Sequence, residues 1–200
     1  KPTNAVEIAS ELHQFTTSFQ SEDLNLGFVT NGLFGYTSYD AIPLFEDIEF
    51  KNQSFDLPLM QYHLFRFTIV FNHFNNELFI LENLLPDQKS NLSELVDLVA
   101  NRAVTTFHFK KINGETSNFN DEEFLEKIAI GQQHCFQGDV FQVVLSRKFK
   151  QQFQGDEFNV YRALRSINPS PYLFYFDYGN FKIFGSSPEA QLTINNQKAI

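Results

Sequence analysis

The sequence predicts an α+β fold of mainly antiparallel β-sheets, an incomplete two-sheet sandwich, with flanking helices. Three observations predict it. Alternating apolar stretches are joined by short polar turns, as at Asn72–Asn76 and Tyr178–Asn180, which is typical of antiparallel hairpins. Capped helix starts occur between these strand pairs, at Asn91 and Asn120. The strands and helices do not alternate one by one, so a doubly wound parallel sheet is not expected.

The composition limits the classes of function. The 200 residues, 42% of them hydrophobic, suffice for one sizeable core. The net charge of −9 and the scattered basic residues argue against binding to nucleic acid or to a membrane surface. No apolar run is long enough to span a membrane, and Lys1-Pro2-Thr3 does not start a signal peptide. A single cysteine, Cys135, excludes a disulfide framework and favours a cytoplasmic protein.

The first elements are a helix and a strand. Apolar residues recur at helical spacing over residues 4–19, with Asn4 placed as the N-cap. A strand is expected over Gly32–Asp40, in which Gly35 suggests a close approach to neighbouring backbone. Asp40 is then expected to cap a short helix that has Pro43 near its first turn.

A hairpin follows. The alternation over Met60–Phe71 predicts one long strand, and residues 77–84 return antiparallel to it. Metal ligation is not expected at His63, His73 or His108, because no acidic partner or third ligand accompanies them.

Two helices are then expected from capping signals. Asn91 and Glu94 form a capping-box pattern before the first helix, and Asn120 and Glu123 repeat it before the second. Gly138 is placed to end that second helix, because glycine readily adopts a left-handed conformation.

The last third of the chain contains the stretch to which the site predictions refer. A central strand that is buried on both faces is expected over Gly138–Phe149, with Gln142 inside it. Asp156 is expected to cap a helix that ends at Asn168-Pro169-Ser170-Pro171. Residues 172–177 and 181–185 then form a hairpin, and Glu189 follows on a short loop stiffened by Pro188. Gln142 and Glu189 are expected to converge at the ends of neighbouring strands.

The C-terminal residues predict one more hairpin. A strand over Ala190–Ile194 meets Asn195-Asn196, a type I′ turn signal, and a return strand would start at Gln197. Because the sequence stops at Ile200, we expect it to be a fragment. We divide it into residues 1–118, part of an N-terminal region, and residues 119–200, the first part of a substrate-binding domain.

Four pieces of the sequence, in order, resemble the chorismate-utilising enzymes, and most closely the large subunit of anthranilate synthase. These pieces are GLFGYTSYDAIPLFE at 32–46, GDVFQVVLSRKF at 138–149, NPSPYLFYF at 168–176 and GSSPE at 185–189. The resemblance implies conversion of chorismate and ammonia to anthranilate and pyruvate, in tryptophan biosynthesis. It also implies a glutamine amidotransferase partner subunit that supplies the ammonia.

The resemblance implies two catalytic residues. The family's general acid, which protonates the departing C4 hydroxyl of chorismate, matches Glu189. Without the resemblance, Glu189 is a capping or turn carboxylate. Gln142 stands where members that add water carry a lysine base, so a neutral amide favours the ammonia-adding branch. A glutamine that only completes a buried backbone network explains Gln142 as well.

The resemblance also implies a site for tryptophan as feedback inhibitor. It matches Asn168, Pro169, Ser170, Pro171, Tyr172 and Leu173, where the family has methionine at the last position. That exchange conserves volume, so the pocket should survive it. A proline-stiffened turn that enters a strand is the structural reading, and the two are compatible.

The resemblance places several required parts outside this sequence. The Mg²⁺ ligands, the catalytic histidine and other substrate-binding groups match positions beyond residue 200, so no metal site and no activity are expected of this piece alone. Two alternatives stay open: an aminodeoxychorismate synthase, against which NPSPY argues, and a non-catalytic ligand-binding domain on the same scaffold. Wide separation of Gln142 and Glu189 would favour the second alternative.

Overall fold

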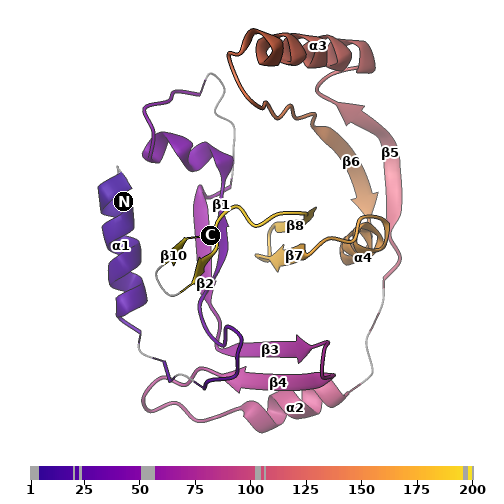
Figure 1. Cartoon of the computed structure of the whole chain (residues 1–200). Helices are drawn as coiled ribbons and strands as arrows, with labels where there is room; N and C mark the ends of the chain where they lie inside the picture. The colour runs from indigo at the N-terminus through magenta and orange to yellow at the C-terminus, as the bar shows by residue number, and fades with distance from the viewer. Residues whose placement is uncertain are drawn as a thin grey trace. The chain divides into compact units, whose positions relative to one another are not determined.

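The computed structural model describes residues 5–19, 21–22, 24–50, 57–101, 105, 107–195 and 198–199 (Figure 1). The chain forms two compact units, residues 1–104 and 105–200. Helices and two-stranded antiparallel sheets make up both units, as the sequence predicts for an α+β protein. None of the described helices has the length and apolar content needed to cross a bilayer.

The first unit begins with a helix and contains two sheets. Its elements are, in order, α1 (Ala5–Thr17), β1 (Leu33–Thr37), the 3₁₀ helix η1 (Tyr39–Leu44), β2 (Met60–Leu64), β3 (Phe67–Asn72), β4 (Glu77–Glu82) and α2 (Leu92–Ala100). Strand β1 pairs with β2, β3 pairs with β4, and α2 lies against β4 (Figure 1). The predicted N-cap Asn4 lies outside the described residues.

The close backbone approach predicted at Gly35 is confirmed. Gly35 is opposite Tyr62 in the β1–β2 ladder. A Cβ built on Gly35 would lie 2.6 Å from the Cα of Tyr62 and would overlap the carbonyl oxygen of Gln61. A side chain at this position would therefore push the two strands apart.

The long strand predicted over residues 60–71 is wrong in one respect: two strands, β2 and β3, replace it, with a break at Phe65-Arg66. The chain changes partner at the break, because β2 pairs back to β1 while β3 pairs forward to β4. Arg66 helps to fix the break, since its guanidinium contacts Glu82 (2.8 Å) and the carbonyl oxygen of Lys89 (2.7 Å). The β3–β4 hairpin itself is confirmed.

One predicted helix cap in the first unit is wrong, and a second stands at the predicted position without its capping hydrogen bond. Asp40 lies inside the first turn of η1, and Ser38 occupies its N-cap position. Asn91 does stand at the N-cap of α2, but its side chain makes no capping hydrogen bond. Its Oδ1 instead accepts from Arg66 Nη2 (2.8 Å), and its Nδ2 donates to Glu94 (2.9 Å). Arg66, in the break between β2 and β3, competes with the backbone for the Asn91 oxygen.

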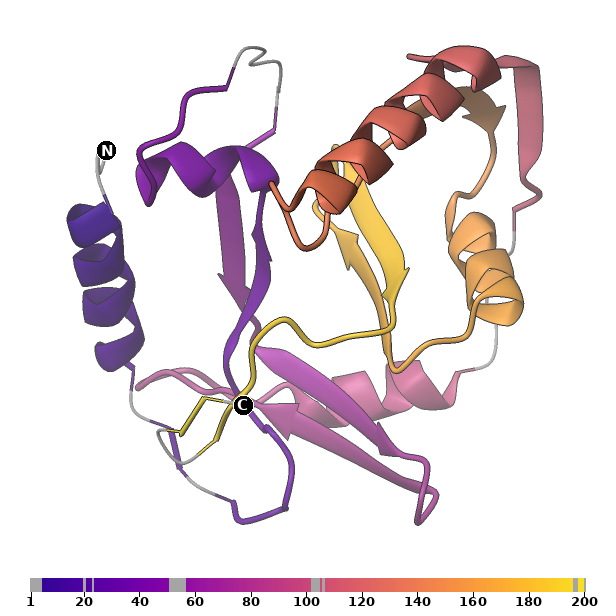
Figure 2. The same ribbon diagram turned by 45° about the horizontal axis from the view of Figure 1, so that its top comes forward.

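The described part of the second unit combines two helices with three two-stranded sheets. Its elements are β5 (Lys110–Ser117), α3 (Asp121–Gln137), β6 (Phe149–Gln154), α4 (Phe158–Ile167), β7 (Tyr172–Asp177), β8 (Lys182–Ser187), β9 (Ile194–Asn195) and β10 (Lys198–Ala199). Strand β5 pairs with β6, β7 with β8 and β9 with β10. Helix α4 packs against β8, and Figure 2 shows β7 and β8 as a yellow hairpin.

The local signals at the two ends of α3 are confirmed, and those at α4 and at the final hairpin are confirmed only in part. Asn120 accepts a hydrogen bond from the Glu123 backbone N–H (2.9 Å), and Glu123 accepts one from the Asn120 N–H (2.9 Å), a complete capping box. Gly138 ends α3 in the left-handed conformation with φ of 82°. The cap predicted at Asp156 is displaced by one residue: Glu157 occupies the N-cap position of α4 without a side-chain capping hydrogen bond, although Asp156 Oδ1 accepts from the Phe158 N–H (2.9 Å). The strand predicted over Ala190–Ile194 is mostly wrong, because β9 comprises only Ile194–Asn195. Its partner β10 begins at Lys198 rather than Gln197, and the turn between them lies outside the described residues.

The central strand predicted over Gly138–Phe149 is wrong. Residues 139–148 form no strand, and β6 begins at Phe149. The apolar residues of the stretch are exposed rather than buried on both faces, Phe141 fully and Val144 by 82%. A strand requires a partner for its backbone groups, and none of the described strands pairs with these residues.

The predicted domain boundary between residues 118 and 119 concerns the family's domains and stays a prediction. In this chain, β5 and β6 pair across that boundary.

Candidate functional site

The open end of the β7–β8 hairpin brings two of the motif segments together. Tyr172 and Leu173 of NPSPYL are opposite Ser187 and Ser186 of GSSPE in the β7–β8 register. The Ser186 hydroxyl donates to the carbonyl oxygen of Asn168 (2.7 Å) and lies 2.9 Å from the Ser170 Oγ. The predicted effector segment and the predicted acid loop are therefore neighbours.

Glu189 is held next to this hairpin end by its backbone. The Ser187 hydroxyl donates to the carbonyl oxygen of Glu189 (3.1 Å), a contact that spans Pro188. The carboxylate itself is exposed in the described part of the chain. The described residues thus leave this carboxylate in contact with solvent, and not in a partly buried apolar setting, which would favour the protonated form that a general acid needs.

Gln142 is placed elsewhere in the second unit. It lies in the unpaired stretch 139–148, and its side chain is exposed. Val143 and Leu145 of this stretch border a cavity of about 300 Å³ against α3, but Gln142 does not. Among the described residues, no hydrogen bond joins Gln142 to Glu189. The predicted convergence of the two is not seen here, and their catalytic roles stay predictions.

A magnesium ion is not accommodated by the residues described. The described parts of the chain contain no group of three or more His, Cys, Asp or Glu side chains that could hold a metal ion. Mg²⁺ prefers six oxygen ligands, including carboxylates.

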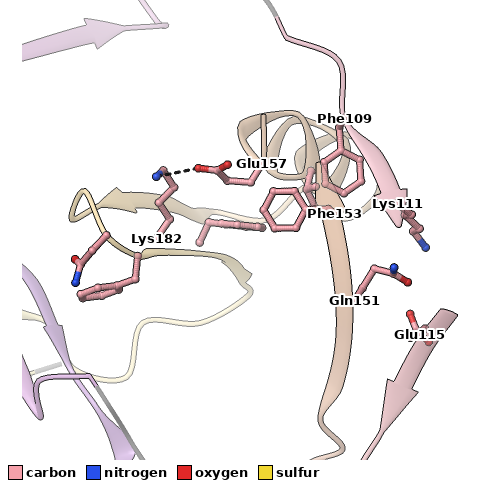
Figure 3. Close-up of a pocket in the computed structure, with 11 residues that line it drawn as sticks. Phe109, Lys111, Glu115, Gln151, Phe153, Glu157 and Lys182 are labelled. Carbon is pink, nitrogen blue, oxygen red and sulfur yellow. Dashed lines mark ion pairs between the residues drawn. The ribbon is translucent and has the colours of Figure 1, made fainter. Parts of the chain in front are cut away.

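A second polar site, which the sequence analysis missed, lies within the second unit. It is a cavity of about 560 Å³ between β5, β6, α4 and β8. Figure 3 shows the rings of Phe109 and Phe153 between two polar ends, with Glu157 and Lys182 at one end. Lys111, Gln151 and Glu115 lie at the other end.

The Glu157–Lys182 pair is an ion pair fixed between α4 and β8. Lys182 Nζ lies 3.0 Å from Glu157 Oε1 and 3.5 Å from Asp177 Oδ1, and both side chains of the closer pair are about three-quarters buried. A backbone hydrogen bond and the Lys182 ammonium lower the pKa of Glu157 below its ordinary value. The hydrogen bond to Glu157 raises the pKa of Lys182, so both groups are charged at neutral pH.

Period-two patterns in the sequence were the available signal for this cavity. Phe109-x-Lys111, Gln151-x-Phe153 and Lys182-x-Phe184 each place an aromatic and a polar side chain on one face of a strand. The pattern alone does not say that the three faces meet, because this depends on which strands pair and on the position of α4.

Comparisons with known proteins agree on one family. A family model described as chorismate binding enzyme matches residues 2–200. Anthranilate synthase component 1 of Lactococcus lactis is 32% identical over 187 residues, which cover 88% of this chain and 41% of that protein. The protein of the same name from Acetivibrio thermocellus is 33% identical over 192 residues, covering 86% and 38% respectively.

A solved structure gives the same result for the fold. The crystal structure of anthranilate synthase component I from Streptococcus pneumoniae matches with a TM-score of 0.66 at 26% identity. The match covers 88% of this chain and 42% of that one. The chain thus spans about two fifths of the length of the relatives that it matches.

Proposed function

The chain belongs to the chorismate binding enzyme family, and from this premise we propose that it is part of an anthranilate synthase large subunit. The complete protein would convert chorismate and ammonia to anthranilate, pyruvate and water. The observation that carries the proposal is the match to anthranilate synthase component 1 sequences along 88% of the chain. The meeting of NPSPYL and GSSPE at one hairpin end supports it. Cytoplasmic location is part of the proposal.

The chemistry needs an acid and a nitrogen nucleophile. Ammonia would form the new bond at C2 of chorismate while the C4 hydroxyl leaves, and Glu189 would give that hydroxyl the proton with which it departs as water. Loss of a ring proton and of the enolpyruvyl group as pyruvate then leaves an aromatic ring. Gln142 is a neutral amide, which does not deprotonate water, and ammonia already carries a lone pair. Because Glu189 is exposed in this chain, residues outside this sequence would have to cover it in the complete enzyme. The relatives are more than twice as long as this chain, which is consistent with such residues.

A partner subunit would supply the ammonia. Component 1 in the relatives' names implies a second component, and we propose a glutamine amidotransferase in that role. Mg²⁺ is proposed for the complete enzyme, with ligands outside this sequence.

The product of the full-length protein tests the proposal. With chorismate, ammonium and Mg²⁺, we expect anthranilate, which is 2-aminobenzoate, detected by its fluorescence and by chromatography against standards. A reaction without ammonium is the control. Formation of 4-amino-4-deoxychorismate would reassign the protein to the aminodeoxychorismate branch. Chorismate binding without any product would leave only a ligand-binding domain.

Feedback by tryptophan is proposed at Asn168–Leu173, and Ser186 offers a way to test it. The Ser186 hydroxyl organises this segment through Asn168 and Ser170. Loss of such hydrogen bonds in Ser186→Ala removes on the order of 0.5–1.5 kcal/mol each. We therefore expect the tryptophan concentration for half inhibition to rise about threefold to tenfold, measured in the same assay.

The control for Ser186 is Ser166→Ala in α4, whose hydroxyl donates to the Arg162 carbonyl within its own helix and to no other group among the described residues. Each variant is compared with its own rate without tryptophan. If both variants respond to tryptophan as the parent does, the effector site lies elsewhere.

A further inference from the structure

The aromatic cavity of the second unit has the features of a small-molecule site. Its volume of about 560 Å³ falls in the usual range for ligand pockets, roughly 300–1,000 Å³. The rings of Phe109 and Phe153 stack, with centroids 5.3 Å apart and planes inclined by 28°. Phe181 and Phe184 line the cavity from the β7–β8 hairpin. Neither Gln142 nor Glu189 lines it, so the cavity is separate from the proposed catalytic residues.

An irregularity in β5 shapes the polar end of the cavity. Between the pairs Ile112–Gln152 and Thr116–Lys150, β5 advances by four residues and β6 by two, so residues 113–115 bulge out. Gln151 fixes the bulge, because its side-chain amide donates to the carbonyl oxygens of Ile112 (2.8 Å) and Asn113 (3.2 Å). Bulges of this kind re-aim side chains and are common beside functional sites. Glu115 is part of this bulge and lines the cavity with Lys111.

The charged side chains at the two ends of the cavity differ in whether they have a partner within the described protein. At one end Lys182 and Glu157 neutralise each other. At the other end, no ion pair or hydrogen bond of the Lys111 ammonium or the Glu115 carboxylate occurs within the part of the chain that the structure describes. Lys111 and Glu115 are both exposed and therefore hydrated in the free protein, and they lie beside the stacked rings, where a ligand could reach both.

We propose that this cavity binds a planar aromatic acid that also carries an N–H donor, of which an aminobenzoate is the simplest kind. The ring would pack against Phe109 and Phe153, where offset stacking of aromatic rings is favourable. The ligand carboxylate would accept from the Lys111 ammonium, and its N–H would donate to Glu115. A purely cationic ligand would leave Lys111 unmatched, and a purely apolar one would leave both charges unmatched. 2-Aminobenzoate is also the product of the reaction proposed above, so the choice of this ligand rests on the proposed function, whereas its binding in this cavity is measured without turnover.

Calorimetric titration of the full-length protein with 2-aminobenzoate tests the proposal. We expect saturable binding that Lys111→Met weakens about tenfold or more, because a charge-assisted hydrogen bond is lost. Lys111→Arg keeps the charge and should bind within about threefold of the parent. Lys110→Met is the matched control: Lys110 is exposed, does not line the cavity and lies on the opposite face of β5. It should bind as the parent does.

Three further ligands test the individual contacts. Benzoate lacks the N–H donor, aniline lacks the carboxylate and cyclohexanecarboxylate lacks the flat ring, so each should bind several times more weakly than 2-aminobenzoate. Circular dichroism of each variant shows whether it is folded.

Four results would overturn the proposal. They are absence of saturable binding to the folded parent, equal losses in the Lys110 and Lys111 variants, full binding by Lys111→Met, and aniline binding as tightly as 2-aminobenzoate. Full binding by Lys111→Met would mean that 2-aminobenzoate binds at another site, such as a catalytic one. Failure of the proposed reaction would appear in the product assay and would not change the titrations.

Discussion

Replacing Glu189 by glutamine in the full-length protein is expected to lower the rate of 2-aminobenzoate formation about 10²- to 10⁴-fold, the usual contribution of a general acid. Glutamine has nearly the same shape as glutamate but has no proton to give to the departing C4 hydroxyl. The loss should appear mainly in kcat, because the substrate's other contacts are unchanged. Initial rates over a range of chorismate concentrations measure it.

The control for this variant is Glu126→Gln. Glu126 is an exposed carboxylate of α3, so the same charge is removed from the same unit away from GSSPE. Its rate should match that of the parent. A Glu189→Gln variant as fast as the parent would show that the proton comes from another group, even if the product is 2-aminobenzoate.

Replacing Gly155 by alanine is expected to destabilise the protein by about 2–5 kcal/mol, through backbone strain and overpacking together. Gly155 has a φ of 101°, a conformation that residues with a side chain rarely adopt. A Cβ at this position would also overlap the carbonyl oxygen of His108 and lie 2.8 Å from its carbonyl carbon. Because both atoms belong to the backbone, a change of side-chain rotamer cannot relieve the overlap. The midpoint of urea unfolding, followed by circular dichroism, measures the loss.

Gly179→Ala separates the two causes. Gly179 also has a positive φ, 85°, but nothing lies within 4 Å of a Cβ built there. Its cost should be the dihedral strain alone, about 1–2 kcal/mol. Equal losses for the two variants would mean that the strand end at Gly155 does not approach His108 closely. Because His108 precedes Phe109, a disrupted approach should also weaken binding of 2-aminobenzoate in the aromatic cavity.

The candidate site was predicted from the sequence in part. The NPSPYL and GSSPE segments were expected to flank one hairpin, and the register of Tyr172 opposite Ser187 places them together. The hairpin is recognisable because its turn and its alternation are local. Convergence of Gln142 with Glu189 depended on a strand over Gly138–Phe149, and that strand is not formed. Its prediction needed a partner strand that no local pattern could specify.

What the sequence by itself determined is the structure that rests on neighbouring residues. The Asn120–Glu123 capping box, the left-handed Gly138 and the hairpins β3–β4 and β7–β8 each depend on contacts over short stretches of chain. The four motifs, in their order, also identified the family.

Only the tertiary structure decided the features that depend on distant partners. Arg66 takes the oxygen of Asn91, 25 residues away, from the expected cap. Strands β2 and β3 separate because each pairs with a different neighbour. The aromatic cavity exists because the faces of β5, β6 and β8 meet beside α4. Each of these outcomes is a competition between local preference and a long-range contact, and the energy of the long-range contact is not encoded in any one stretch of sequence.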